Sequence, residues 1–262
     1  MGRAGPESTH ELMRYFESAD EAFTQADWES LQSRFRESDN ILGIPRNTIK
    51  VVEHQGRKLV IKSFKVPHLI NRIAYRHFRK SKARRSFEHA TRLMELGIGT
   101  PAPVFYEESR GAFMLGESYY GSELVQYDLL FSDLVENPEY PGATKIITAF
   151  TAFTHSLHEK KVLFLDHSTG NTLMTKQGDD YTFSLVDLNR MQFKELTDQE
   201  RLRNLERLTP HEDQARLMGR VYGELMGWDP DKTAQKVWDY THAFQERFWR
   251  KQRMKKKLVF WK

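Results

Sequence analysis

The spacing of apolar side chains changes along the chain and divides it into parts. Between residues 8 and 38 apolar positions recur at helical intervals, which predicts one or two amphipathic helices. From residue 47 two β-branched runs, 48–53 and 58–64, flank the turn-forming stretch His54-Gln55-Gly56-Arg57, which predicts a β-hairpin. The apolar positions of the first part are Leu12, Phe16, Ala22, Phe23, Trp28, Leu31 and Phe35.

Further along, helix and strand patterns alternate before helix dominates. A helical region is predicted over 68–96, ending where Gly97, Gly99 and Pro101 supply stop signals. Short apolar and aromatic runs at 103–106, 112–115 and 118–125 predict an antiparallel sheet. After residue 142 the pattern is mainly helical, interrupted near 162–187 by a loop and two brief strands. We therefore expect an α+β protein with a helical N-terminal extension (1–40), a strand-rich domain (41–125) and a larger helical domain (126–262).

Composition narrows the class of protein. The 262 residues are 39% hydrophobic and 29% charged, which suits a folded core and argues against wholesale disorder. The absence of cysteine excludes disulfides, thiolate metal sites and cysteine nucleophiles, and favours a reducing compartment. No signal-peptide core and no run of about 20 apolar residues is present. The expected location is cytoplasmic.

Charge is segregated along the chain. Residues 7–39 hold nine acidic and three basic residues, whereas residues 46–92 hold fourteen basic residues and two acidic ones. A second basic segment lies in the tail, where Arg250 to Lys257 are followed by Phe260 and Trp261. Such segments favour polyanionic partners such as an anionic membrane surface or nucleic acid, and a solvated helix face is the alternative.

The residues most informative about chemistry lie between 162 and 190. Asp166, Asn171 and Asp187 are each bracketed by apolar residues that would hold them at strand ends beside a cleft. Phosphoryl transfer from ATP needs one carboxylate to orient the accepting hydroxyl, and an amide oxygen with a second carboxylate to bind Mg²⁺. Asp166 and Asn171 could instead cap a turn. An acid after Phe-Ser-Leu-Val on a buried strand favours function for Asp187.

These motifs, and their order along the chain, resemble those of the protein-kinase-like fold. Asp166 and Asn171, followed by Asp187, are similar to its catalytic loop and metal-binding motif. Lys62 in Val-Ile-Lys resembles its strand-borne lysine, and Glu88 on the following helix resembles the glutamate that pairs with that lysine.

The same resemblance implies a hinge and a fold. Ser122-Glu123-Leu124-Val125 resembles the hinge whose main chain meets adenine, which makes Glu123 and Val125 nucleotide-binding candidates. The implied fold is bilobal, with a small antiparallel-sheet N-lobe carrying one main helix and a larger helical C-lobe.

Departures from the protein-kinase pattern argue against an ordinary protein kinase. Phe164 and Leu165 stand where the His and Arg of His-Arg-Asp would be, and Leu188-Asn189 replaces Phe-Gly. No Ala-Pro-Glu segment follows. In the region of the expected first strand, one glycine, Gly43, stands where ordinary protein kinases have three.

A closer resemblance covers most of the chain. Arg79-Lys80-Ser81-Lys82-Ala83, the Thr100-Pro101-x-Pro103 pattern and Val186 to Met191 look like the lipopolysaccharide kinase family, which phosphorylates Kdo or heptose. The resemblance implies ATP- and Mg²⁺-dependent transfer to a sugar hydroxyl of a lipid A-linked acceptor. It places the reaction at the cytoplasmic face of the inner membrane. The basic segments Arg76 to Arg85 and Arg250 to Lys257 are independently expected to contact the anionic surface. The sequence does not decide which sugar or which hydroxyl is phosphorylated. No nucleic acid partner is expected.

Three other readings remain. One is an atypical protein kinase of the RIO type, and another is a pseudokinase that binds polyanions. The third is an aminoglycoside or choline phosphotransferase, although those usually carry a histidine where Phe164 stands. His167 is interpreted as a loop residue that hydrogen-bonds the turn, and His155 and His158 as structural.

Overall fold

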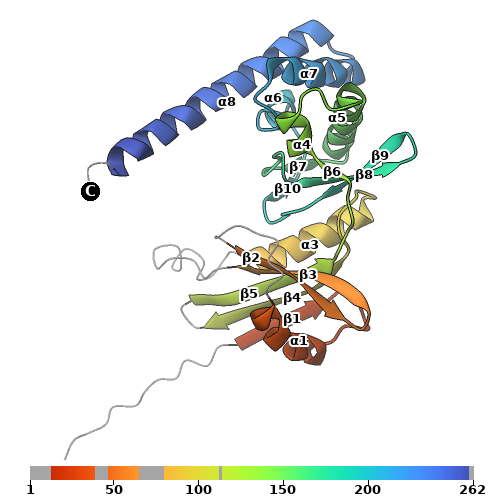
Figure 1. The fold of residues 1–262 in the computed structure, drawn as a ribbon, viewed down its shortest axis with the longest axis vertical. Coiled ribbons are helices and arrows are strands. Elements are labelled where there is room, and N and C mark those ends of the chain that lie inside the picture. Colours follow the sequence, from red (N-terminus) through yellow and green to blue (C-terminus); the bar gives the residue numbers. More distant parts are fainter. Residues whose placement is uncertain (1–12, 39–46, 65–79, 112–113, 260–262) are drawn as a thin grey trace, which may run out of the picture. The chain divides into compact units, whose positions relative to one another are not determined.

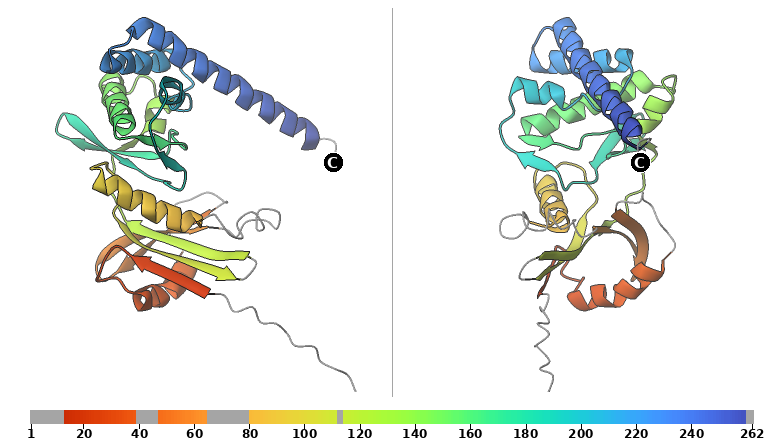
Figure 2. Two further views of the ribbon diagram at one scale, coloured as in Figure 1. Left: turned by 180° about the vertical axis from the view of Figure 1, so that it is seen from behind. Right: turned by 90° about the vertical axis from the view of Figure 1, so that its left-hand side faces the viewer.

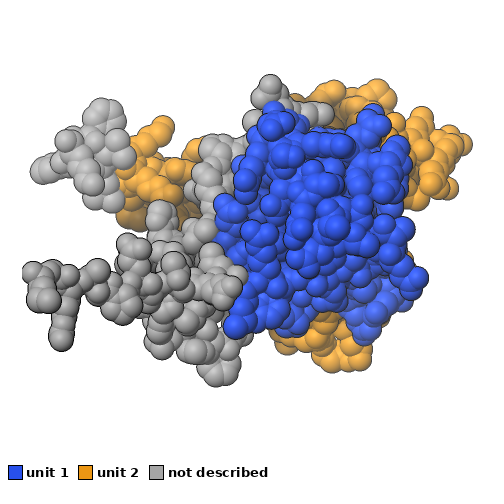
Figure 3. Space-filling model, turned by 90° about the horizontal axis from the view of Figure 1, so that it is seen from below, with its two compact units in different colours: residues 1–95, 101–125 blue, residues 96–100, 126–262 orange. Residues whose placement is uncertain are grey.

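The computed structural model describes residues 13–38, 47–64, 80–111 and 114–259. The chain divides into two compact units, unit 1 (residues 1–95 and 101–125) and unit 2 (residues 96–100 and 126–262), which Figure 3 distinguishes by colour. Several stretches singled out in the sequence fall outside the described ranges: residues 8–12, the Gly43 segment, residues 68–79 of the expected helix with Arg76 to Arg79, residues 112–113, and the final Phe260-Trp261-Lys262.

Unit 1 is built on a five-stranded sheet in the order β1-β4-β5-β3-β2, in which every neighbouring pair is antiparallel. The predicted hairpin is confirmed. Its two-residue turn places both Gln55 (φ 50°) and Gly56 (φ 76°) in the left-handed region, the backbone that matches the twist of the flanking strands. The strands are β1 Met13–Ser18, β2 Asn47–His54, β3 Arg57–Phe64, β4 Pro103–Gly111 and β5 Met114–Glu123.

A helix covers each face of this sheet (Figure 1). Helix α1 (Gln25–Glu37) buries Trp28, Leu31 and Phe35 in a core that contains Ile61 and Phe105 from the strands. Helix α3 (Lys82–Glu95) packs Ala83 and Phe87 against the opposite face, where Phe64 and Tyr106 lie. Because successive strand residues point to opposite faces, neighbours such as Phe105 and Tyr106 serve the two cores separately.

Two predictions for this region were wrong. Helix was expected across 8–38, but Met13–Ser18 is a strand that pairs with β4, from Met13 opposite Arg110 to Ser18 opposite Phe105. The helical spacing of apolar residues could not reveal that the sheet has an edge for this segment to join. In addition, the three short strands expected over 103–125 are two long ones, β4 and β5.

Unit 2 is largely helical and has its own core. Helix α5 (Ala143–Glu159) packs on α7 (Glu212–Met226), and α7 packs on α8 (Pro230–Val259). The last two approach closely because α7 carries glycine at the contact: a Cβ on Gly219 would lie 2.5 Å from the Cα of Ala234. The core contains Phe131, Phe150, Leu205, Met218 and Tyr222 among other residues. The shorter helices are α4 Phe131–Glu136 and α6 Asp198–Arg203.

Two small sheets hold the loops of unit 2. Strands β6 (Leu129–Leu130), β8 (Thr172–Gln177) and β9 (Asp180–Leu185) form one, and β7 (Val162–Phe164) pairs with β10 (Met191–Phe193) in the other. The sequence predicted two brief strands here, so this part is richer in strand than expected. None of the helices in the described ranges has the length and apolar content that a bilayer crossing requires.

Candidate active site

The loop that carries Asp166 is fixed at both ends. It leaves the fully buried strand β7 and enters β8. The N–H of Leu165 donates to the carbonyl of Arg190 (3.0 Å), and the N–H of Asn171 donates to the carbonyl of Ser168 (3.0 Å). Main-chain bonds therefore set the path of the loop before any side chain contributes.

Asn171 is hydrogen-bonded to the main chain of Asp166 and to that of Val186, the residue before Asp187. The side-chain Nδ2 of Asn171 donates to the main-chain carbonyl of Asp166 (2.8 Å). The carbonyl of Asn171 accepts from the N–H of Val186 (3.0 Å), the residue before Asp187. These two bonds join the catalytic-loop candidate and the metal-binding candidates into one arrangement within unit 2.

Asp187 occupies an unusual backbone conformation. Its φ of 58° lies in the left-handed region, which non-glycine residues seldom adopt and which Asp and Asn tolerate best. Its Oδ1 accepts a hydrogen bond from Nδ2 of Asn189 (2.6 Å). The buried Leu188 between them anchors the turn. A strained backbone with a directed carboxylate is the kind of outlier that gathers at functional sites.

The donor atoms suit Mg²⁺. Because Nδ2 of Asn171 is used on Asp166, its amide presents the oxygen on its other branch, and Asp187 supplies carboxylate oxygen. Mg²⁺ prefers oxygen and is usually held by one or two carboxylates together with substrate phosphates and water. Across the described ranges, no group of three or more His, Cys, Asp and Glu side chains gathers into a metal-binding cluster.

Sequence reasoning missed the residues that surround Asp166. Nη1 of Arg207 contacts Oδ1 of Asp166 (3.0 Å) and the carbonyl of Leu165 (3.3 Å). Nη1 of Arg190 lies 3.9 Å from the same oxygen. One turn before Arg207, Nδ2 of Asn204 donates to the carbonyl of Phe164 (2.8 Å). The sequence offered one local signal for these two residues. Asn204 and Arg207 are polar positions between leucines that repeat every three residues, Leu202, Leu205 and Leu208.

His158 is buried and hydrogen-bonded through both ring nitrogens. His158 bonds Tyr222 Oη through Nδ1 (2.7 Å) and Asn204 Oδ1 through Nε2 (3.1 Å). Burial lowers the pKa of His158 to about 4, so its imidazole is neutral at pH 7. This network orients the amide of Asn204 toward the carbonyl of Phe164, at the start of the loop that carries Asp166.

His167 differs from the expectation. Neither ring nitrogen has a hydrogen-bond partner in the described part of the chain, so it does not bond the turn through its side chain. The ring packs against Phe150 and Phe164, with centroids 5.4 and 5.8 Å away. Burial lowers the pKa of His167 to about 3, so its imidazole is neutral at pH 7.

In unit 1, Lys62 and Glu88 lie on the same side of the sheet. Lys62 stands opposite Tyr120 in the register of β3 and β5 and alternates with Ile61, so it shares the α3-covered face with Phe64. Its Nζ lies 5.3 Å from the ring centroid of Phe64.

Glu88, on α3, is engaged by two cations of its own region. Lys80 Nζ lies 2.8 and 2.7 Å from its two oxygens, and Arg84 Nε lies 2.9 Å away. Burial opposes ionisation of Glu88, but hydrogen bonds from Lys80 and Arg84 outweigh it and lower its pKa.

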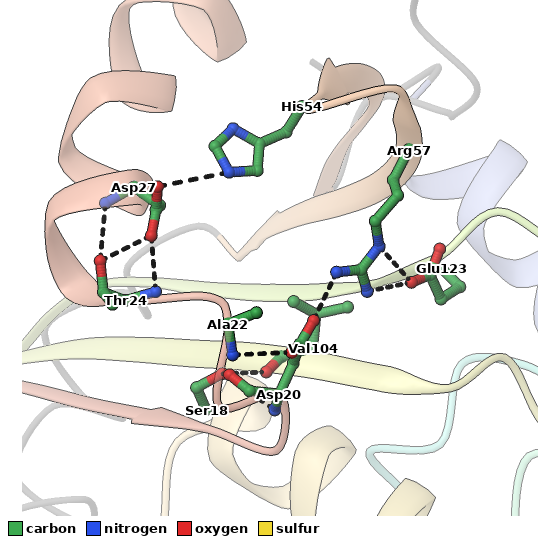
Figure 4. Close-up of polar contacts among 9 residues, drawn as sticks. All are labelled: Ser18, Asp20, Ala22, Thr24, Asp27, His54, Arg57, Val104 and Glu123. Atoms are coloured by element: carbon green, nitrogen blue, oxygen red, sulfur yellow. Dashed lines mark hydrogen bonds and ion pairs between the residues drawn. The ribbon is translucent and has the colours of Figure 1, made fainter.

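Glu123 and Val125 lie where the chain leaves unit 1. The N–H of Glu123 donates to the carbonyl of Ala102 (2.9 Å), and the N–H of Leu124 donates to the carbonyl of Lys58 (2.9 Å). The carboxylate of Glu123 accepts from Nε of Arg57 (3.0 Å). Nη1 of the same guanidinium contacts the carboxylate of Asp20 (Figure 4). The Glu123 side chain is thus part of an ion-pair network, and Val125 is the last residue of the unit.

Comparisons with known proteins bear on the family and the fold. A sequence model described as "Lipopolysaccharide kinase (Kdo/WaaP) family" matches residues 43–226. A solved structure of WaaP in complex with acyl carrier protein is similar, with a TM-score of 0.50 and 17% identity over 78% of this chain and 92% of that one. At that identity the similarity speaks for the fold, and the expected bilobal kinase-like architecture is confirmed. Among curated proteins no match was found.

Proposed function

The chain belongs to the lipopolysaccharide kinase (Kdo/WaaP) family, and we propose that it transfers the γ-phosphate of ATP to a sugar hydroxyl of the lipopolysaccharide inner core. The acceptor is Kdo or heptose linked to lipid A. The observation that carries the proposal is the joined arrangement of Asp166, Asn171 and the Val186-Asp187 segment. Phosphoryl transfer asks little covalent chemistry of a protein, so positioned carboxylates and amides are the features to look for.

Each residue has a role in this proposal. Asp166 orients the acceptor hydroxyl and takes its proton as the oxygen attacks phosphorus. Asn171 and Asp187 would hold Mg²⁺, which supplies charge neutralisation on the triphosphate oxygens. Arg207 and Asn204 keep the loop of Asp166 in place through their bonds to its main chain.

Unit 1 contributes nucleotide contacts in the same proposal. Lys62 contacts the α- and β-phosphates, supplying fixed positive charge where negative charge shifts. Glu88 pairs with Lys62, in competition with Lys80 and Arg84, which engage it in the structure. The main chain of Glu123 and Val125 receives adenine, while the Glu123 carboxylate stays with Arg57.

The acceptor's location suggests a membrane partner. We place the protein at the cytoplasmic face of an anionic membrane, with the second half of α8 as the contact. That half exposes Phe248 (44%), Trp249 (57%) and Met254 (55%) and extends beyond the other helices of its unit (Figure 2). Aromatic side chains beside lysine and arginine suit a lipid headgroup region. Its exposed cations include Arg247, Arg250, Lys251, Arg253, Lys255 and Lys256.

The function is tested with ATP, Mg²⁺ and defined acceptors. Kdo-lipid A and heptosylated Kdo-lipid A are incubated with the protein, and products are weighed by mass spectrometry. A gain of one phosphate on either lipid is expected, and Asp166→Asn lowers turnover by about 100- to 10,000-fold. Unchanged turnover in Asp166→Asn refutes its role.

The same experiment separates the rival functions. Radiolabel appearing on added protein while the lipids stay unmodified identifies a protein kinase of the RIO type. Absence of transfer and of nucleotide-dependent thermal stabilisation identifies a pseudokinase. A ligand at 100 times its dissociation constant stabilises a protein by about 2.7 kcal/mol, which a melting curve detects.

A further inference from the structure

Two arginines approach the carboxylate of Asp166 from different elements. Arg207 follows α6 and brings Nη1 to 3.0 Å, whereas Arg190 precedes β10 and brings Nη1 to 3.9 Å. The closest approach of each guanidinium is to the same oxygen, Oδ1. One negative charge therefore faces two positive charges, which leaves a local excess of one.

Another carboxylate beside Arg207 is itself paired with arginines. Glu206, the residue before Arg207, faces Arg203 (3.8 Å) and Arg247 (3.5 Å). Across these ion pairs four guanidiniums face the two carboxylates of Asp166 and Glu206. The carboxylate of Asp187 accepts from Asn189 and is assigned to Mg²⁺ in the proposed function. The surface beside Asp166 therefore carries positive charge at the place where the acceptor hydroxyl lies in the proposed function.

The two arginines next to Asp166 are held differently. Arg207 also donates to the carbonyl of Leu165 (3.3 Å), and its guanidinium lies 5.9 Å from the ring centroid of Phe244 on α8. These contacts fix it as a residue that positions the loop. Arg190 has a fixed main chain, since its carbonyl accepts from Leu165 N–H, but its side chain is 55% exposed. A long, exposed ion pair is weak, so Arg190 gives up little when it turns to another anion.

We propose that Arg190, beside Arg207, binds an anionic substituent of the acceptor sugar next to the hydroxyl that Asp166 orients. The ligand is a carboxylate or a phosphate, because a guanidinium matches both with two parallel hydrogen bonds. This inference rests on the proposed function and narrows its acceptor. It favours an acidic sugar such as Kdo, or a sugar carrying phosphate, over a neutral heptose.

Binding without ATP tests the subsite separately from catalysis. The probes are Kdo, its uncharged methyl ester and a heptose phosphate, titrated into wild-type protein and Arg190→Gln by isothermal calorimetry. Arg220→Gln is the matched control, because Arg220 is similarly exposed (59%) and contacts a carboxylate, Asp231, at 2.9 Å on the distant α7–α8 contact. Thermal melting of all three proteins checks that the substitutions leave the fold intact.

The expected result is at least tenfold weaker binding of one charged probe to Arg190→Gln, with Arg220→Gln like wild type. Loss with Kdo identifies a carboxylate ligand, and loss with heptose phosphate identifies a phosphate. The methyl ester binds wild type and Arg190→Gln equally. Equal affinity of wild type and Arg190→Gln for both charged probes overturns the proposal.

Kinetics supplies the second readout. Arg190→Gln should raise KM for the charged acceptor at least tenfold, change kcat less than threefold and leave KM for ATP unchanged, and Arg190→Lys should restore part of the loss. A fall in kcat with KM intact shows that Arg190 acts on Asp166 instead, which overturns the subsite. If wild type modifies no acceptor the proposed function fails, while the calorimetry still decides whether Arg190 binds the anion.

Discussion

Asn204 connects the interior of unit 2 to the loop of the proposed catalytic residue. Its Oδ1 meets the buried His158, and its Nδ2 donates to the carbonyl of Phe164, two residues before Asp166. Asn204→Ala removes both bonds and leaves groups without partners, at a cost of about 1–3 kcal/mol. Urea unfolding should show this loss of unfolding free energy. In kinetics, kcat should fall by a larger factor than the factor by which KM for ATP rises.

The control for Asn204 is an amide without such contacts. Gln235 lies exposed on α8 and bonds only Asp239, four residues on, among the contacts in the described ranges. Gln235→Ala is expected to match wild type in stability and kcat. If Asn204→Ala lost stability while kcat stayed at the wild-type value, the link from this amide to catalysis would be wrong.

His167 gives stability a pH dependence whose sign follows from burial. Its folded pKa is lowered to about 3, below the ordinary value of about 6.5. As pH falls below about 6.5 the unfolded chain gains a proton that the folded chain refuses, so stability is lost with falling pH. His158, with a pKa lowered to about 4, acts in the same direction.

Replacing His167 by leucine isolates its contribution to the pH dependence of the unfolding free energy. Between pH 7 and pH 5 wild type should lose about 2 kcal/mol more unfolding free energy than His167→Leu. Comparing the change with pH cancels the packing cost of the substitution. His242→Gln, at an exposed position of α8, should follow the wild-type profile. Parallel profiles for wild type and His167→Leu would show that the ring is not buried and neutral.

Among the elements, α1 shows how much of unit 1 depends on one helix. Trp28 is fully buried, and its Nε1 donates to Oε2 of Glu107 in β4 (2.6 Å). Trp28→Ala should destabilise unit 1 by about 3–5 kcal/mol through the cavity. Trp28→Phe should cost about 1–3 kcal/mol, since Oε2 of the buried Glu107 loses its donor at 2.6 Å and keeps Nε2 of Gln32 at 3.2 Å.

Hydrogen exchange of β4 amides and thermal unfolding measure this effect. Gln25→Ala, an exposed position at the start of the same helix, is the control and should leave exchange unchanged. Exchange in β4 that is equally slow in Trp28→Ala and Gln25→Ala would mean that α1 does not support the sheet.

Elements were predictable where the pattern was local. The hairpin of β2 and β3 follows from two β-branched runs around Gln55-Gly56, and α1 follows from Trp28, Leu31 and Phe35 at helical spacing. Strand β1 was not predictable, because Met13–Ser18 becomes a strand only by pairing with β4, some ninety positions later. Its own side chains are mostly exposed and give little period-two signal.

At the scale of the whole molecule, the charge of α8 sets the proposed membrane contact. The substitutions Arg250→Gln, Lys251→Gln and Arg253→Gln neutralise three of its cations. Each should remove about 1 kcal/mol of the free energy of binding to an anionic membrane. Binding to phosphatidylglycerol vesicles should weaken on the order of 100-fold, and wild-type binding should fade as salt screens the charges. Vesicle sedimentation measures both effects.

A triple variant elsewhere on unit 2 controls for net charge. Lys145→Gln, Lys232→Gln and Lys236→Gln change three exposed lysines outside the second half of α8 and should bind vesicles like wild type. If the α8 variant bound phosphatidylglycerol vesicles as tightly as wild type, the membrane proposal would fail.

The sequence by itself determined the kinase-like order of motifs. Asp166, Asn171 and Asp187 could be chosen because polar residues inside apolar runs are costly unless they are used, and the structure links their segments within unit 2. Their catalytic roles, like those of Lys62, Glu88, Glu123 and Val125, remain predictions for the experiments above.

Only the tertiary structure decided what surrounds those residues. Arg207 and Asn204 meet the Asp166 loop from about forty positions away, and Glu88 is shared by Lys80 and Arg84. His167, which looked like a partner for the turn, is enclosed by Phe150 and Phe164. The physical reason is that side-chain type and spacing reveal local preference, whereas charge pairing and desolvation depend on which distant segments the fold packs together.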